Sequence, residues 1–406
     1  MSSRLWDKGT PLDQRVLQYT AGEDHALDER LVSYDVQASI AHAEMLHAQQ
    51  LLSASDLEAI HTGLTALAEE HSRGEWRIEL ADEDGQTALE KHLTRRIGQA
   101  GGRIHLGRSR NDQVLTALRL YLRDVIEEVR ARAVQVANAL DELATRERAT
   151  QLPGYTHMQQ AMPSSVPLWA GGFAAEIRDD AESLAQVQRR LAKCPLGSAA
   201  GYGTPGLPID RELTSQKLGF TGPHEPVTAV QLSRGKAESQ LLFELSILMQ
   251  DLGRFAADVL LFYTQEFGFL ELPDAFTTGS SIMPQKRNPD VFEVIRARSA
   301  TAQACLLEAL GICTKLPSGY QRDLQLLKAP LFRSIDLTVQ TLGILPAAIG
   351  AMKFRPQRIT LDPAMHAAEE ANRLVLTESI PFREAYRRVT EALAELLEGS
   401  GKRGPK

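Results

Sequence analysis

A short loop in the last third of the chain combines groups suited to chemistry on an anion. Residues 279–290 have the sequence Gly-Ser-Ser-Ile-Met-Pro-Gln-Lys-Arg-Asn-Pro-Asp, with two hydroxyls followed by a Lys-Arg pair. Pro289 is well placed as the first residue of a helix, with Asn288 as its N-cap. The loop then leads into the positive end of a helix dipole, which stabilises a bound anion. A capped helix alone would explain Asn288 and Pro289, but not the serines and the lysine beside them.

A second candidate segment has the sequence Gly-Arg-Ser-Arg-Asn-Asp at residues 107–112. It precedes the longest uninterrupted helical pattern in the chain, with Ser109 or Asn111 as the possible cap. Arg108 and Arg110 at a helix N-terminus oppose the helix dipole unless an anion is bound between them. The segment is therefore a candidate for binding an anionic substrate.

Two further segments carry groups that could act on a substrate. His157 lies in Gly154–Pro163, which we expect to be a loop between two long helices. A lone histidine is more often structural than catalytic, but hydroxyl and amide groups crowd this loop, so His157 is a candidate acid or base. Residues 316–325 and the following Lys328 add cationic, polar and aromatic groups. A solvated turn would also account for that second segment.

Long helices must position these segments. The stretch from Val114 to about Ala149 has no Gly or Pro. Its apolar residues recur every three or four positions, which is typical of one buried stripe, and the helix would be about 50 Å long. Residues 166–194, 228–268 and 291–316 have similar patterns. Helices this long bury their apolar faces only side by side, so the sequence predicts an all-α fold with a long central helical bundle. We expect other subunits to cover part of these faces.

Breaks in the helical pattern suggest two smaller helical domains flanking the bundle. We expect an N-terminal helical domain at 1–105, the central bundle at 106–354 and a shortened C-terminal helical domain at 355–406. The motif G-x-G-x-x-G at 201–206 follows no predicted strand, so it is not a dinucleotide site. The charged cluster at 189–193 is most simply a solvated helix end.

Composition excludes several classes of function. The formal net charge of −7 argues against broad binding to nucleic acid or to an anionic membrane. The N-terminus has no apolar signal-peptide region. The three cysteines show neither a disulfide framework nor metal-ligand spacing, which favours a reduced, cytoplasmic protein.

Three motifs together resemble those of the argininosuccinate lyase family in the fumarase/aspartase superfamily. They are the loop at 279–290, Gly-Arg-Ser-Arg-Asn-Asp-Gln-Val at 107–114 and Gly-Tyr-Thr-His-x-Gln at 154–159. The resemblance runs from about residue 12 to 390. It implies a homotetramer with each active site assembled from three subunits, and no metal or organic cofactor. The implied reaction is reversible β-elimination of argininosuccinate to arginine and fumarate, the last step of arginine biosynthesis.

The resemblance also implies roles for single residues. Ser280 would be the general base on the succinyl β-carbon, and His157, paired with Glu293, would protonate the leaving nitrogen. From the residues alone His157 would be the base, because the free pKa of a serine hydroxyl is far above 7. Lys286 and Asn288 would hold the substrate and its carboxylate. Further substrate-binding candidates are Arg108, Ser109, Arg110, Asn111, Thr156, Tyr320, Gln325, Lys328 and Gln86.

Some positions depart from the family pattern. Gln86 stands where the family has an active-site histidine; it can form hydrogen bonds but cannot carry charge. Leu326 and Leu327 replace an acidic pair, and the C-terminal region is shorter than usual. Two alternatives therefore stay open: another fumarate-releasing lyase of the superfamily, or a non-catalytic, crystallin-like protein on the same scaffold.

Overall fold

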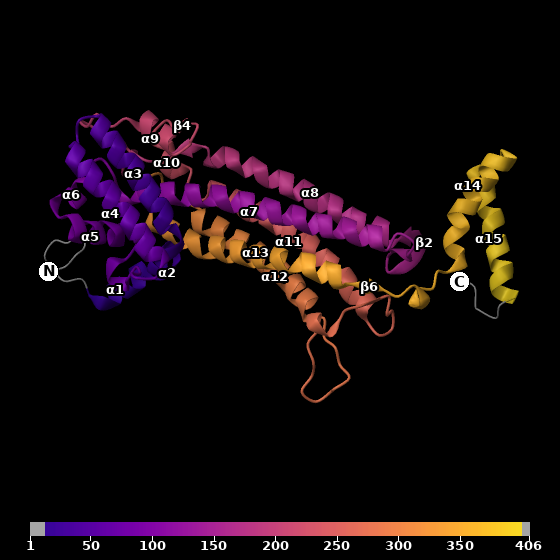
Figure 1. Ribbon diagram of the computed structural model, residues 1–406. Coiled ribbons are helices and arrows are strands. Elements are labelled where there is room, and N and C mark those ends of the chain that lie inside the picture. Colours follow the sequence, from indigo (N-terminus) through magenta and orange to yellow (C-terminus); the bar gives the residue numbers. More distant parts are fainter. Residues whose placement is uncertain (1–12, 400–406) are drawn as a thin grey trace. The chain divides into compact units, whose positions relative to one another are not determined.

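The computed structural model describes residues 13–399, which are mostly helical (Figure 1). Two compact units are distinguished by their internal packing. Unit 1 takes in the chain up to Arg132, Asp179–Gln250 and Arg298–Thr341, and unit 2 takes in Ala133–Arg178, Asp251–Ala297 and the chain from Leu342. The all-α prediction is confirmed, while the three sequence domains stay a prediction.

The helices and strands are bounded as follows. The α-helices are α1 (Gln14–Ala21), α2 (Asp24–Leu27), α3 (Val32–Ala48), α4 (Ala54–Ser72), α5 (Gly85–Ile97), α6 (Gln99–Arg103), α7 (Arg110–Arg146), α8 (Val166–Leu191), α9 (Arg211–Lys217), α10 (Ala229–Leu232), α11 (Lys236–Tyr263), α12 (Asp290–Cys313), α13 (Lys328–Ala351), α14 (Ala367–Glu378) and α15 (Phe382–Gly399). Short 3-10 helices include η1 (Asp28–Leu31), η2 (Leu80–Asp82) and η4 (Arg322–Leu327). The strands are β1 (Gln151–Thr156), β2 (Gln159–Ser165), β3 (Lys193–Cys194), β4 (Gly222–Pro223), β5 (Leu270–Glu271) and β6 (Lys353–Phe354).

The longest helix, α7, follows the sequence pattern closely. It has 37 residues, which corresponds to about 55 Å. Every residue of the predicted stripe is buried: Leu115, Leu118, Leu122, Val125, Val129, Ala133, Val136, Leu140 and Leu143. Acidic Asp112 in the first turn and basic Arg146 in the last turn both interact favourably with the helix dipole and stabilise α7.

Helix α13 has no counterpart among the predicted long helices. Pro330 lies in its first turn, where a backbone N–H would lack a partner within the helix in any case. Pro346 lies inside the helix and removes one backbone hydrogen bond there. Arg322–Ala351 is long and apolar enough, by length and composition, to cross a membrane, and half of its most apolar window is buried inside the structure. The core helix of a globular protein meets the same criterion.

The predicted helix at 228–268 is divided in two. Helix α10 ends at Leu232 and α11 begins at Lys236. Gly235 between them has φ of 79°, a left-handed conformation that a helix cannot contain and that glycine adopts at little cost. A side chain there would also collide with Cys313. Residues around this division line both pockets described below, Arg234 in one pocket and Leu232, Ser233 and Lys236 in the other.

In unit 2, an aromatic cluster packs helices α8, α11 and α12 together. The Trp169 ring stacks on Phe255 with centroids 5.4 Å apart, and Phe255 also contacts Phe173 and Phe292 edge-on. Trp169 donates its indole N–H to Asp258, 3.0 Å away. Phe255 is fully buried. This cluster therefore supports the start of α12, which follows the serine-rich loop.

We predict that Phe255→Ala lowers the free energy of unfolding by about 3–5 kcal/mol, because it leaves a cavity among the three aromatic rings that Phe255 contacts. Urea unfolding at a fixed protein concentration measures the change. Phe382→Ala is the matched control, since Phe382 on α15 is 50% exposed and should cost less than about 1 kcal/mol. Equal losses in the two variants would contradict this account of the core.

Candidate functional site

A pocket in unit 1 brings six of the predicted site residues together. Its volume is about 110 Å³. The predicted residues that line it are Gln86, Arg110, Asn111, Tyr320, Gln325 and Lys328. Asp24, Asp84, Val114, Arg234 and Arg322 complete the lining. We call it the Lys328 pocket. It contains cations and carboxylates together, so it can hold a ligand that carries both signs of charge.

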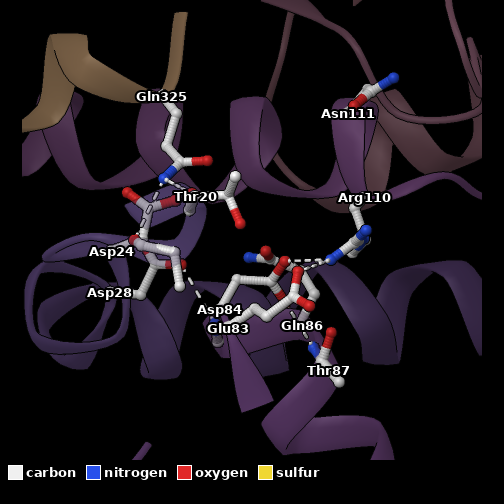
Figure 2. Close-up of polar contacts among 12 residues, drawn as sticks. Thr20, Asp24, Asp28, Glu83, Asp84, Gln86, Thr87, Arg110, Asn111 and Gln325 are labelled. Carbon is white, nitrogen blue, oxygen red and sulfur yellow. Dashed lines mark hydrogen bonds and ion pairs between the residues drawn. The ribbon is translucent and has the colours of Figure 1, made fainter. Parts of the chain in front are cut away.

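Arg110 enters the Lys328 pocket from the first turn of α7 and meets carboxylates of the protein itself. Its guanidinium donates to Asp84, 2.7 Å away, and lies 3.6 Å from Glu83 (Figure 2). Burial lowers the pKa of Arg110, but Asp84 and Glu83 more than offset it, so the net shift is upward. The unfavourable arginine at this helix N-terminus is thus already compensated without a bound anion.

Asp112 fixes the turn from which Arg110 projects. Its buried carboxylate accepts hydrogen bonds from the backbone N–H groups of Ser109, Gly197 and Ala199 at 2.8–2.9 Å. Burial raises the pKa of Asp112 to about 6, although those three donors oppose the shift. The start of α7 is therefore held against the segment after β3.

Lys328 lies at the base of the pocket between two carboxylates. Its ammonium is 2.8 Å from Asp24 and 2.5 Å from Asp28, and both carboxylates come from the α2–η1 segment. Burial lowers the pKa of Lys328, but Asp28 and Asp24 more than offset it, so the ammonium stays charged. Burial is also the largest influence on Asp24 and raises its pKa to about 7, although Lys328 acts in the opposite direction. One of the two carboxylates is thus set to change charge near neutral pH.

Gln86, which replaces the expected histidine, is also tied to a carboxylate. Its side-chain amide donates to Asp35, 2.7 Å away, and both side chains are buried. Burial raises the pKa of Asp35 well above its ordinary value, with Asp28 acting in the same direction. A neutral amide at this position adds no charge beside a buried carboxyl group, and its hydrogen bond partly opposes the upward shift of the Asp35 pKa.

The segment between α12 and α13 also contributes Tyr320, Arg322 and Gln325 to the Lys328 pocket. The Gln325 amide donates to the carbonyls of Thr20 and Ala21 at 3.0 and 3.2 Å, which ties η4 to the end of α1 (Figure 2). Arg322 also donates to Thr20, at 2.9 Å. The Arg234 guanidinium lies 5.5 Å from the centre of the Tyr320 ring.

Arg108 and Ser109 do not line the Lys328 pocket. Arg108 is buried and donates to the Ser39 hydroxyl, 2.8 Å away. Burial lowers its pKa despite the nearby carboxylates. The Ser109 hydroxyl accepts from the backbone N–H of Asn111 at 3.4 Å. In this chain both residues shape the start of α7, and their predicted contact with substrate stays a prediction.

The segment with His157 forms a β-hairpin and not the loop expected from sequence. Strands β1 and β2 pair antiparallel, with Thr156 opposite Gln159. His157 and Met158 form the two-residue turn, with φ of 52° and 61°. Two successive positive φ values match a type I′ turn, which twists with the strands. Thr156 and His157 are exposed at its tip in unit 2.

Ser280, Lys286 and Asn288 lie on a loop that projects from the start of α12 in unit 2 (Figure 1). The loop is closed at its base, where Thr278 and Asn288 exchange backbone hydrogen bonds of 3.0 and 2.8 Å. The Asn288 side chain donates to the Thr278 hydroxyl at 3.2 Å and to the Gly279 carbonyl at 3.3 Å, so it braces the loop. Helix α12 begins at Asp290, one residue later than predicted.

The Ser280 hydroxyl accepts hydrogen bonds from the backbone N–H groups of Ile282 and Met283, at 3.4 and 3.2 Å. These donors stabilise negative charge on the oxygen, which suits a base. Glu293 is exposed in the first turn of α12. Among the described residues of this single chain, no hydrogen bond or ion pair joins His157 to Glu293 or to Ser280. Their catalytic roles stay predictions.

Four charged residues of the Lys328 pocket were not predicted as site residues: Asp24, Asp84, Arg234 and Arg322. Asp84 lies two residues before the predicted Gln86, and Arg322 lies within the predicted segment 316–325. Asp24 and Asp28 are four residues apart, a spacing that can place two carboxylates on one helical face. No sequence pattern marked Arg234 as a candidate site residue.

The sequence is similar to those of known lyases. A family model described as lyase matches residues 11–304. Argininosuccinate lyase of Sorangium cellulosum is 44% identical over 401 residues, covering 98% of this chain and 93% of that protein. The enzyme of the same name from Thermotoga neapolitana is 38% identical, covering 96% of this chain and 98% of that protein. This chain belongs to the argininosuccinate lyase family.

Solved structures of the superfamily agree with this membership. EDDS lyase in complex with formate is similar with a TM-score of 0.81 and 26% identity, over 96% of this chain and 78% of that one. A fumarate lyase:delta crystallin from Brucella melitensis in native form has a TM-score of 0.78 at 18% identity, which supports the fold alone. The helical architecture is thus that of the argininosuccinate lyase family and its superfamily.

We predict that Asp24→Asn removes a pH dependence from substrate binding. If Lys328 binds a substrate carboxylate as predicted, the ionised Asp24 would compete for Lys328 above pH 7, and the protonated group would not compete below it. In the unmodified protein KM should therefore rise as pH increases through about 7. In the variant KM should stay near the low-pH value across this range.

Steady-state kinetics of fumarate release between about pH 6 and pH 8 measure this dependence. Asp323→Asn is the control, because Asp323 is an exposed carboxylate on η4 that does not line the Lys328 pocket. An unchanged KM profile in Asp24→Asn would refute the role of Asp24.

Proposed function

We propose that this chain catalyses the reversible β-elimination of argininosuccinate to arginine and fumarate. The observation that carries the proposal is its 44% identity to an argininosuccinate lyase over 98% of the chain. The retained Ser280 loop, His157 and Lys328 pocket supply the chemical groups that the reaction needs. The proposed place in metabolism is the last step of arginine biosynthesis.

The charges of the Lys328 pocket suit such a substrate. Argininosuccinate carries carboxylates together with a cationic guanidinium and an ammonium group. Arg110, Arg234, Arg322 and Lys328 can meet carboxylates, and Asp24 and Asp84 can meet cations. Arginine forks pair with carboxylates through two parallel hydrogen bonds. A substrate carboxylate would share or displace the existing Arg110–Asp84 pair.

The chemical step places specific demands on the Ser280 loop. Removing a proton next to a carboxylate creates a dianionic intermediate, so fixed positive groups must face that carboxylate. We propose that Lys286 and the start of α12 supply them, with Asn288 orienting the carboxylate. Ser280 would take the β-proton, and His157 would protonate the leaving nitrogen with the support of Glu293.

We also propose that the protein is a cytoplasmic homotetramer with active sites shared between subunits. Unit 1 carries large apolar side chains exposed on the bundle helices: Phe243 on α11, and Leu307 and Leu310 on α12, are 49%, 70% and 48% exposed. Exposed apolar groups gathered on long helices mark an interface. Subunit association would also bring together His157, Ser280 and Glu293 of different chains, which share no hydrogen bond or ion pair among the described residues of one chain. The proposed partners include no nucleic acid and no membrane.

We predict that Ser280→Ala abolishes turnover, with a loss of at least about a hundredfold in kcat, because the proton acceptor is removed. Substrate binding should remain measurable by calorimetry. Ser281→Ala is the matched control, since the neighbouring hydroxyl is exposed and has no assigned role. Near-normal turnover of Ser280→Ala would show that its role is misassigned.

A substrate panel separates the proposed activity from its alternatives. Fumarate release from argininosuccinate, adenylosuccinate, aspartate and malate would be assayed in parallel. Release only from one of the other three substrates would assign another lyase activity of the superfamily. No release from any of them would favour the non-catalytic, crystallin-like alternative.

We predict that Leu307→Glu combined with Leu310→Glu reduces the native mass from four chains to fewer, because charge at a buried interface is costly. Light scattering after gel filtration measures the mass. Leu376→Glu on α14 is the control, as this leucine is 83% exposed and lies outside the bundle. A tetramer that survives the double substitution would exclude this part of α12 from the interface.

A further inference from the structure

A second pocket in unit 1 is lined by cations that the proposed reaction does not use. Its volume is about 360 Å³. The lining residues are Arg189, Arg190, Lys193, His224, Ala229, Leu232, Ser233, Lys236 and Ala237. We call it the His224 pocket. It contains four cationic side chains and no carboxylate, unlike the Lys328 pocket.

The cations of the His224 pocket have few charged partners in the part of the chain that the structure describes. Among the described residues, none of its four cations forms an ion pair with a carboxylate. Arg190 donates to the neutral amide of Gln240 at 2.8 Å, and Arg189 donates to that of Gln186 at 3.3 Å. Lys236 is the first residue of α11, where a positive charge opposes the helix dipole. The solvated helix end predicted from sequence accounts for Arg189 and Arg190 at the end of α8, but not for Lys236.

A buried arginine contacts residues that line the pocket, and the buried carboxylate of Glu238 partly offsets its positive charge. Arg119 is 2% exposed and donates to the Ser233 hydroxyl at 2.7 Å and to Nδ1 of His224 at 3.2 Å. It also donates to the Lys193 carbonyl. Its Nε is buried and has no hydrogen-bond partner among the described residues. Arg119 thus supports Lys193, His224 and Ser233, three residues that line the pocket.

The hydrogen bond from Arg119 also determines the tautomer of His224. An arginine can only donate, so Nδ1 of His224 accepts and the ring proton sits on Nε2. Burial, then Arg119 and the neighbouring lysines, lower the pKa of His224 to about 4. At neutral pH the ring is therefore an uncharged N–H donor on the wall of a cationic pocket. Such a wall offers hydrogen bonds to oxygen atoms of an anion.

We propose that the His224 pocket binds a small polyanion of the phosphate class, such as pyrophosphate or the phosphate chain of a nucleotide. Four cations match a ligand with several negative charges, and arginine and lysine are the usual phosphate-binding residues. The volume of about 360 Å³ exceeds the space of a single anion. Ala229, Leu232 and Ala237 supply an apolar surface for the rest of a larger ligand. The site does not depend on the proposed lyase activity.

Calorimetric titration of the full-length protein with pyrophosphate tests the proposal. We expect binding that weakens as NaCl is raised from about 20 to about 300 mM, because salt screens exposed charges. The double variant Lys193→Gln with Lys236→Gln should lose affinity by more than tenfold. Both side chains are exposed, so the fold should be retained, which thermal unfolding checks.

Lys217→Gln combined with Lys353→Gln is the matched control, because it removes two exposed or half-exposed lysines elsewhere. Lys217 pairs with Glu44 at 2.7 Å, and Lys353 lies in β6. This control should keep the affinity for pyrophosphate. No heat of binding at low salt would overturn the proposal. Binding that competes with the lyase substrate and is unaffected by Lys193→Gln with Lys236→Gln would also overturn it, since it would locate pyrophosphate in the Lys328 pocket.

Titration with ATP tests whether the pocket recognises a nucleotide or the phosphate chain alone. Tighter binding of ATP than of pyrophosphate, lost in the Lys193 and Lys236 double variant, would support a nucleotide that uses the apolar surface. Equal affinities would support recognition of the phosphate chain alone.

Discussion

A helix of 37 residues with one continuous apolar stripe is stable only when other helices cover that stripe. This constraint governs much of the structure. Helix α7 buries all nine residues of its predicted stripe, and its first turn carries Arg110 and Asn111 into the Lys328 pocket. The same constraint leaves apolar side chains on α11 and α12 uncovered within one chain. The fold therefore positions the site residues and creates surfaces suited to association of subunits.

The Lys328 pocket shows how the fold holds charged side chains away from water. Removing Lys328 from water would be costly, and two carboxylates from the α2–η1 segment offset that cost. Arg110 is held in the same way by Asp84 and Glu83. Before a substrate enters, the cations are oriented by internal partners. A substrate carboxylate then needs only to compete for them, which costs less than assembling them from solvated side chains.

Local patterns in the sequence predicted the long helices and failed elsewhere for physical reasons. The stripe of α7 depends on spacing alone, so it was predicted residue by residue. Helix α13 was missed because Pro330 and Pro346 usually end a helix. The β1–β2 hairpin was missed because its strands are short, contain prolines and lack a clear alternation of apolar and polar residues.

The candidate site was predictable only in part. Six residues of the Lys328 pocket were predicted from motifs, by resemblance to the family. Asp24 was not, because its partner Lys328 is 304 positions away in the chain and local patterns do not show such a contact. Arg108 illustrates the opposite case, since its motif suggested substrate binding while its side chain is buried against Ser39. A motif indicates a position in the fold more reliably than the direction of each side chain.

The hairpin turn at His157 has a consequence for how this family can vary. Positive φ values at His157 and Met158 cost about 1 kcal/mol or more for residues other than glycine, so the pairing of β1 with β2 must maintain them. A two-residue turn contains no spare length. The pairing already contains one irregularity, between Gly154 and Tyr155, so β2 has one residue more than β1. Inserting or deleting one residue between that irregularity and the turn would shift the register and turn the imidazole towards the opposite face of the hairpin. The lengths of β1 and β2 therefore fix the direction of the His157 side chain. Insertions and deletions should be tolerated more readily in the surrounding helices than in this hairpin.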